Sequence, residues 1–180
     1  MSDDHPTIGI IVAMTVDRVI GHDGQLPWSL PEDLQLFREL TLGKTVIMGR
    51  RTYESLSGPL DGRQNLVVSR NLAELPGITI CRSWEEAKLV ASQRAKDIWV
   101  IGGADIYRTA LKETQQLIVS WVEGNYPGDV LFPALWRVDW ELFRQTACQG
   151  FIQCRYRRLK HSLSPDEVQA AGPLSTPVQN

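Results

Sequence analysis

Short runs of apolar residues, separated by polar turns that contain glycine or proline, recur along most of the chain. Residues 8–14 and 44–49 are nearly continuous apolar runs, a pattern typical of strands that are covered on both faces. Similar runs predict strands at 65–69, 77–81, 97–101 and 116–124. Two closing strands, predicted to form a hairpin that turns near Gly150, occupy 140–147 and 151–161.

Helical patterns alternate with these strands. Pro31 suits the first turn of a helix over 31–41, and Ser29 with Glu32 has the spacing of a capping box. Gly43 is placed to end this helix. Further helices are expected at 50–56, at 83–92 and directly after residue 103.

This alternation predicts a single α/β domain with a central, mostly parallel β-sheet. We expect about eight strands, flanked by about four helices, with an antiparallel edge at the C-terminal end. Ligands of such a fold bind at the carboxyl ends of the strands. The domain is predicted to span residues 1–161.

Residues 162–180 differ in composition from the rest of the chain. Large apolar residues become few, while Pro, Ser, Gln and Ala accumulate. We therefore expect a C-terminal tail outside the core, with a short helix at 165–171.

Composition and charge limit the kinds of protein this chain can be. Of its 180 residues, 43% are hydrophobic and 22% charged, as is usual for a soluble globular protein. The net charge of −2 argues against general attraction to nucleic acid or acidic membranes. The first residues have neither the charge nor the cleavage site of a signal peptide, and no run is long enough to span a bilayer. We expect a cytoplasmic protein.

The cysteines, histidines and basic segments predict neither disulfides nor a metal site. Three cysteines are too few and too irregular for a disulfide framework, although two of them flank the turn near Gly150. The basic stretch 154–161 is interpreted as a charged edge strand and not as a nucleic-acid surface. The cysteines are Cys81, Cys148 and Cys154, and the scattered histidines are His5, His22 and His161.

Asp33 is the first candidate for chemistry. Helical spacing puts it on the same side of the 31–41 helix as Leu30, Leu34 and Phe37. A first-turn carboxylate can simply face water and complement the helix dipole. If it is buried instead, it needs donors, and a ligand with two adjacent N–H groups would satisfy both oxygens.

Two strand-to-helix junctions carry groups that suit phosphate. Gly102-Gly103 follows one strand, and Gly49 to Thr52, with two arginines between, follows another. Each alone is most simply a tight or basic turn, but together they suggest a dinucleotide spread across the sheet edge. Arg63 is either a clamp for a ligand carboxylate or an ordinary surface arginine.

Four ordered motifs resemble one known family. They are VDRVIGHDGQLPWSLPEDLQLF (16–37), VIMGRRTYESL (46–56), GRQNLVVS (62–69) and VIGGADIY (100–107). Between about residues 8 and 160 the chain resembles bacterial chromosomal-type dihydrofolate reductase. The resemblance implies a monomeric enzyme that reduces 7,8-dihydrofolate with NADPH, by hydride transfer to pterin C6 and protonation at N5, and that binds antifolate inhibitors.

The resemblance also implies roles for substrate residues. Asp33 matches the carboxylate that binds the pterin and favours N5 protonation, with water as the direct donor. Trp28 matches a tryptophan that positions this water, and Ser120 keeps the hydroxyl of a common threonine. Arg63 matches the clamp on the glutamate α-carboxylate. The remaining matches are Ile11, Val12, Ala13, Ile101 and Tyr107 at the pterin, and Leu34, Phe37, Leu56 and Leu60 at the benzoyl group.

Cofactor residues follow from the same resemblance. Residues 21–26 match a mobile loop that closes over the nicotinamide. Gly102 and Gly103 match a pair joined by a cis peptide. The chain departs from the family at Arg70, where serine is common, and at Asp105, where some members carry arginine. The implied cofactor contacts are Ala13, Ile20 and Tyr107 near the nicotinamide, Gly49, Arg50, Thr52, Gly102 and Gly103 at the diphosphate, and Arg50, Arg51, Ser69 and Arg70 near the 2′-phosphate.

Two other interpretations remain open at this stage. One is a pyrimidine or pterin reductase of the same fold, such as the reductase of riboflavin synthesis; Asp33, Phe37 and Arg63 together argue against it. The other is a non-catalytic protein that keeps the fold and binds a folate or a nucleotide.

Overall fold

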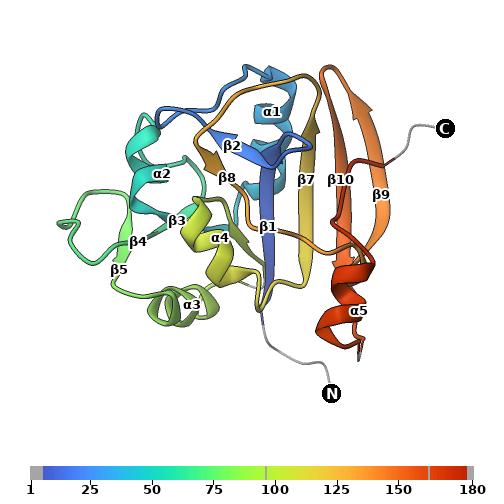
Figure 1. Cartoon of the computed structure of the whole chain (residues 1–180). Coiled ribbons are helices and arrows are strands. Elements are labelled where there is room, and N and C mark those ends of the chain that lie inside the picture. The colour runs from blue at the N-terminus through green and yellow to red at the C-terminus, as the bar shows by residue number, and fades with distance from the viewer. Residues whose placement is uncertain (1–5, 96, 162, 178–180) are drawn as a thin grey trace.

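A computed structural model describes residues 6–95, 97–161 and 163–177. Its centre is an eight-stranded sheet with helices on both faces (Figure 1). The sheet strands are β1 (Thr7–Met14), β3 (Thr45–Gly49), β4 (Gln64–Val68), β5 (Thr79–Cys81), β6 (Asp97–Val100), β7 (Gln116–Val122), β9 (Trp140–Cys148) and β10 (Phe151–Arg158). The helices are α1 (Pro31–Thr41), α2 (Arg50–Ser55), α3 (Trp84–Ser92), α4 (Ala104–Ala110), α5 (Pro165–Ala170) and the short 3₁₀ helix η1 (Arg137–Asp139).

The strand order is β5-β4-β3-β6-β1-β7-β10-β9. All neighbouring pairs are parallel except those of β10, which is antiparallel to both β7 and β9. The predicted α/β fold with an antiparallel C-terminal edge is therefore confirmed.

The interpretation of residues 154–161 as an edge strand is wrong. β10 lies inside the sheet, and the hairpin places β9 at the edge. Two of the arginines of β10 have partners within the chain. Arg157 pairs with Glu141 of β9, and the Arg158 guanidinium bonds the Thr114 carbonyl at 2.6 Å while lying over the ring of Trp140.

Alternate residues of β1 enter different clusters on the two sides of the sheet. Ile10, Val12 and Met14 belong to the largest core cluster, which α3 and α4 cover. Ile11 faces the other way, toward the cluster on the side of α1 and α2, and Ala13 packs with Trp28. This two-sided burial explains the continuous apolar run of β1.

The predicted capping box of α1 is wrong. The helix begins after Leu30, and no side chain caps it. Glu32 is used elsewhere, because its carboxylate accepts a hydrogen bond of 3.1 Å from the backbone N–H of Gln149 in the β9–β10 turn. The start of α1 is thus tied to the closing hairpin.

The three cysteines are unpaired, as expected. The β9–β10 register puts Cys148 opposite Phe151 and Cys154 opposite Gln145, so the two cysteines that flank the turn do not face each other. No helix in the described part of the chain is long and apolar enough to cross a membrane.

The helix predicted in the tail is present as α5, with a capping box between Ser164 and Glu167. Beyond it the tail docks on the segment that precedes β9. The Leu174 N–H donates to the carbonyl of Leu135 at 2.8 Å, and the Arg137 N–H donates to that of Gly172 at 3.1 Å. The composition of the tail predicts that it lies outside the core. The Leu174 side chain differs from this prediction, because it packs against the main core cluster.

We therefore expect Leu174→Asp to destabilise the protein by about 1–3 kcal/mol, because it puts a charge against apolar packing. Urea unfolding of the full chain measures this. Leu163→Asp is the matched control, since Leu163 lies in the same tail and is exposed. Equal losses in the two variants would contradict a packing role for Leu174.

Candidate active site

Asp33 is half-buried on α1, close to the carboxyl end of β7. The Ser120 hydroxyl of β7 donates to one oxygen of its carboxylate at 2.5 Å. Ser120 is itself buried and lies opposite Ala13 of β1. The inward placement that the helical spacing predicted for Asp33 is confirmed. The other oxygen of the Asp33 carboxylate has no hydrogen-bond donor among the described residues.

The surroundings of Asp33 favour its neutral form more than water does. Burial raises the pKa of this carboxyl above its ordinary value, and the hydrogen bond from Ser120 acts in the opposite direction. Such a carboxylate gains from a ligand that brings N–H donors, since it then recovers part of the solvation it has lost.

Trp28 closes one side of this region. It is 8% exposed, packs with Val19 and Val122, and makes an edge contact with Tyr126 at 5.5 Å between ring centroids. Its indole N–H is buried and has no acceptor among the described residues. Buried N–H groups are usually paired, so a water or ligand oxygen is the expected partner.

The two strand-to-helix junctions meet at the sheet edge, since β3 and β6 are neighbours. The Gly49 N–H donates to the Gly102 carbonyl at 2.7 Å. Gly102 and Gly103 are joined by a cis peptide, and Gly102 has a φ of 128°. A Cβ on Gly102 would lie 3.2 Å from the Thr52 hydroxyl, so only glycine leaves this backbone open to a bound group.

Tyr107 links α4 to the central strand β1 close to the Gly102–Gly103 junction. Its buried hydroxyl donates to the Ile11 carbonyl at 2.8 Å, which joins α4 to β1. Burial raises the pKa of Tyr107, so it remains a neutral donor. Its ring packs on Phe132 at 4.8 Å between centroids.

Arg63 is a half-buried cation without an ion-pair partner in the described part of the chain. It donates to the Thr41 hydroxyl at 3.1 Å and lies 5.9 Å from the Phe37 ring centroid. Burial and the neighbouring Arg38 lower the pKa of Arg63, which still remains protonated. It lines an open groove of about 570 Å³ at the amino ends of β4 and β5.

The other predicted substrate residues divide between the two sides of the sheet. Leu56, Leu60 and Ile101 pack on the same side as Ile11, while Leu34 is 57% exposed and leaves its face of α1 uncovered. The Val12 side chain lies in the core on the opposite side, so only its backbone can face a ligand there.

The predicted lid, residues 21–26, begins as a tight hairpin. His22 and Gln25 exchange backbone hydrogen bonds of 2.9 and 3.0 Å. Asp23 and Gly24 between them have φ values of 48° and 76°, as a two-residue hairpin turn requires.

A distant segment holds this hairpin, and sequence patterns missed it. Strands β2 (Val19–Gly21) and β8 (Val130–Leu131) are too short to show a periodicity, yet they pair. The Asp129 N–H donates to the Gly21 carbonyl at 3.1 Å, and its carboxylate accepts from the Asp23 N–H at 3.4 Å.

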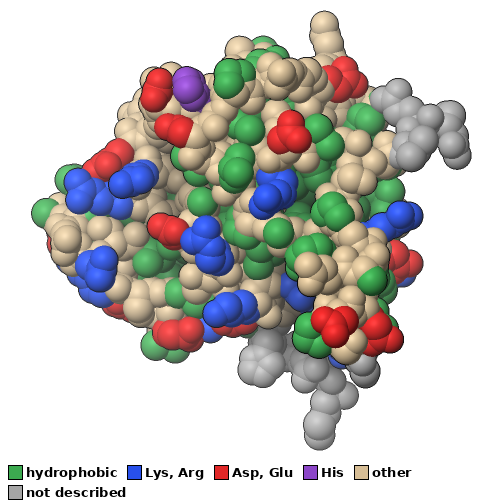
Figure 2. Space-filling view, in the orientation of Figure 1, with side chains coloured by type: hydrophobic (Ala, Val, Ile, Leu, Met, Phe, Trp, Pro, Cys, Tyr) green, Lys and Arg blue, Asp and Glu red, His purple; other side chains and the backbone are tan. Residues whose placement is uncertain are grey.

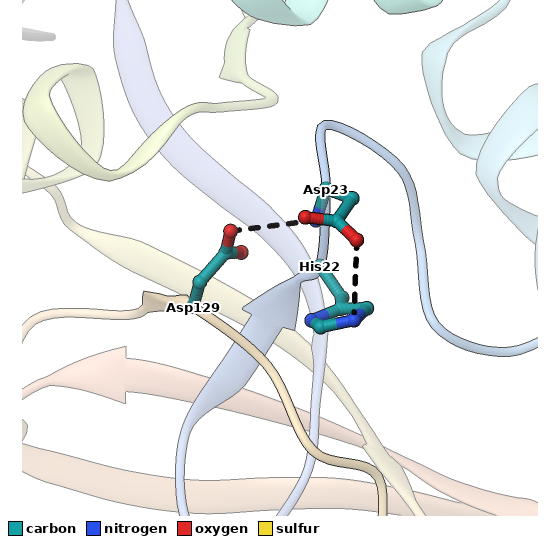
Figure 3. A group of neighbouring side chains, drawn as sticks. All are labelled: His22, Asp23 and Asp129. Atoms are coloured by element: carbon teal, nitrogen blue, oxygen red, sulfur yellow. Dashed lines mark hydrogen bonds and ion pairs between the residues drawn. The ribbon is translucent and has the colours of Figure 1, made fainter.

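Figure 3 shows His22 beside Asp23 and Asp129 at this turn. All three side chains are exposed, and the contacts among them account for their closeness. His5 lies outside the described residues.

Cations gather at the carboxyl end of β3 and β4. Arg50 pairs with Glu54 at 2.6 Å, whereas Arg51 and Arg70 are exposed and have no ion pair within residues 6–95, 97–161 and 163–177. Asp105, the acidic departure from the family, is paired with Arg108 at 2.7 Å. Lys and Arg side chains gather over this half of the molecule, near α2 and α4 (Figure 2).

The fold and these junctions place the chain among α/β proteins in which ligands bind at the carboxyl edge of a mostly parallel sheet. A family profile described as dihydrofolate reductase matches residues 7–158. The chain belongs to the dihydrofolate reductase family.

Individual dihydrofolate reductases are similar to this chain over most of its length. The chain is 38% identical over 154 residues to dihydrofolate reductase of Haemophilus influenzae, which covers 83% of this chain and 96% of the relative. It is 38% identical over 141 residues to dihydrofolate reductase type 3 of Salmonella typhimurium, covering 77% and 86%. A solved structure of dihydrofolate reductase from Enterococcus faecalis, complexed with NADP(H) and RAB-propyl, is similar with a TM-score of 0.79 and 26% identity, covering 86% and 97%.

Replacing Ser120 tests the hydrogen bond to Asp33. Since that bond lowers the Asp33 pKa, Ser120→Ala raises it further, and the pH below which folate binding weakens should move upward. Fluorescence titration of folate at several pH values measures the shift. Ser120→Thr keeps the hydroxyl and is expected to match the unchanged protein; an equal shift in both variants would rule out the hydrogen bond as its cause.

Proposed function

We propose that this protein reduces 7,8-dihydrofolate to tetrahydrofolate with NADPH. The observation that carries the proposal is the half-buried Asp33 carboxylate, held by Ser120 beside the carboxyl end of β1 and β7, in a chain of the dihydrofolate reductase family. The 2-amino and N3 groups of a pterin supply two adjacent N–H donors, which is the partner such a carboxylate lacks.

Asp33 orients the ring and sets the electrostatic field at N5. Its negative charge favours a proton on the pterin, and water delivers that proton. Trp28 supports this role, because its unpaired indole N–H can hold a water beside the ring. At the other end of the substrate, Arg63 binds the glutamate carboxylate.

The residues present fit NADPH. Gly49, Gly102 and Gly103 carry no side chains, which leaves room for a diphosphate beside their backbone. The nearby Arg50, Arg51 and Arg70 suit a 2′-phosphate. When bound, NADPH supplies the hydride. Closure of residues 21–26 would keep water from the nicotinamide, with backbone groups of Ala13 and Ile20 at its carboxamide.

The family resemblance supports a monomeric enzyme. The unpaired cysteines support a reducing, cytoplasmic compartment. Antifolates that present a paired N–H edge are expected to compete for Asp33.

A spectrophotometric assay tests the proposal, with NADPH or NADH offered against dihydrofolate or an aminopyrimidine ribityl phosphate. We expect oxidation of NADPH only when dihydrofolate is present. Turnover of the ribityl phosphate alone would indicate a riboflavin-type reductase. Tight binding of NADPH and folate without oxidation would indicate a non-catalytic binding protein.

A further inference from the structure

Two arginines lie directly opposite each other in the hairpin that closes the sheet. Arg155 of β10 pairs with Arg144 of β9, so both side chains leave the same face of the sheet. Like charges in this arrangement destabilise a strand pair unless something neutralises them. Because β9 is the outermost strand, the arginine pair lies at the open edge of the sheet (Figure 1).

The arginine pair is on the side of the sheet that α1 and α2 cover. Cys154 and Tyr156, the neighbours of Arg155 along β10, belong to the main core cluster on the other side. Arg155 itself lies opposite Ile118 of β7, which belongs to the cluster beneath α1 and α2. Arg155 is partly buried and Arg144 is exposed, so a small ligand can reach both guanidinium groups from water.

Neither arginine has a carboxylate partner in the parts of the chain that the structure describes. Arg157, two residues further along β10, differs from them because it pairs with Glu141. Burial and the charge of Arg144 lower the pKa of Arg155, which still remains protonated. The repulsion between Arg144 and Arg155 is therefore not relieved by the chain itself.

The carboxylates of α1, the helix on this side of the sheet, have other partners. Glu32 accepts from the backbone N–H of Gln149 at 3.1 Å, and Glu39 accepts from the side chain of Gln35 at 3.0 Å. Asp33 accepts from Ser120. A counter-ion for the arginine pair must therefore come from outside these residues.

We propose that Arg144 and Arg155 bind a small oxyanion of the phosphate class. Each guanidinium presents a planar fork of N–H donors, and two forks that face each other across a strand pair can bind one anion together. Thr146 lies two residues from Arg144 on the same face of β9 and adds a hydroxyl beside them. A phosphate in this position neutralises the repulsion and joins β9 to β10. Neither arginine is among the residues assigned to the substrate or the cofactor, so the inference goes beyond the proposed function.

The test is titration of the full chain with inorganic phosphate near pH 7, followed in NMR spectra through the side-chain Nε–H signals of the arginines. Chloride keeps the ionic strength constant. We expect the signals of Arg144 and Arg155 to shift together, with a Kd on the order of 10 mM. A second titration with glycerol 3-phosphate shows whether a free phosphate ion or the phosphate end of a larger molecule binds more tightly.

Single substitutions assign the binding to this pair. Arg144→Gln and Arg155→Gln should each weaken phosphate binding about fivefold at the arginine that remains. Arg157→Gln is the matched control, because Arg157 is on the same hairpin and already has a partner, and it should leave the affinity unchanged. In chloride alone, Arg144→Gln should unfold at slightly higher urea than the unchanged protein, since it removes the repulsion.

Three outcomes would overturn the inference. Phosphate might shift only the signals of other arginines, such as Arg63 or Arg70, which would place the anion elsewhere. Chloride might shift the signals of Arg144 and Arg155 as much as phosphate does, which would show general screening. Unchanged affinity in Arg144→Gln would exclude a shared site. Because these signals report residue by residue and need no turnover, the result is independent of the assay of dihydrofolate reduction.

Discussion

Asp33→Asn is expected to lower kcat/KM for dihydrofolate by about 10²- to 10³-fold near pH 7. The amide keeps the size of the side chain and can still accept from Ser120, but it carries no charge to favour a proton on the pterin. Steady-state rates against pH measure the effect. In the unchanged protein activity should fall at low pH as Asp33 becomes protonated, and the variant should lack this acid limb. Full activity at pH 7 would remove Asp33 from the mechanism.

The same substitution is expected to stabilise the fold, which provides a control against simple misfolding. Burial raises the Asp33 pKa above its unfolded value, so the native state binds the proton more tightly than the unfolded chain does. The carboxyl therefore favours folding below its unfolded pKa, and this contribution is lost as pH rises through the folded pKa. At neutral pH Asp33→Asn should unfold at higher urea than the unchanged chain, and the difference should disappear below about pH 4. Loss of both activity and stability at pH 7 would contradict this explanation.

The main elements could be predicted because their signals are local. The buried strands appear in the sequence as apolar runs, and helical spacing alone predicts that the Asp33 side chain points inward. The bond from Ser120 could not be found this way, since the two residues lie 87 positions apart and meet only when β7 is placed beside β1. The resemblance to the family supplied that partner, and the structure brings the pair together.

The errors share a physical cause, which is competition between local and tertiary partners. Glu32 has capping-box spacing, but the Gln149 amide takes its carboxylate. The basic side chains of 154–161 resemble those of an exposed edge strand, but β9 pairs with β10 and forms the edge instead.

Arg63→Gln is expected to raise KM for dihydrofolate by roughly 10- to 100-fold, the usual cost of losing a charge-assisted pair, with a small change in kcat. Contacts with Thr41 and Phe37 already hold the Arg63 side chain in one conformation, so the guanidinium is ordered before an anion binds. The neighbouring Arg38 disfavours its charge, and a carboxylate would relieve that repulsion. The reacting ring lies at the other end of the substrate, and for this reason the loss should fall on KM.

Two comparisons make the expectation specific. Arg38→Gln is the matched control, because it removes a neighbouring cation from the exposed side of α1 and should raise KM much less. A dihydropterin without the aminobenzoylglutamate tail has no carboxylate for Arg63, so its KM should be the same in Arg63→Gln and in the unchanged protein. If Arg63→Gln raises KM for the dihydropterin as much as it raises KM for dihydrofolate, Arg63 supports the fold of the site and does not bind the carboxylate. Retention of the normal KM for dihydrofolate would place the glutamate elsewhere.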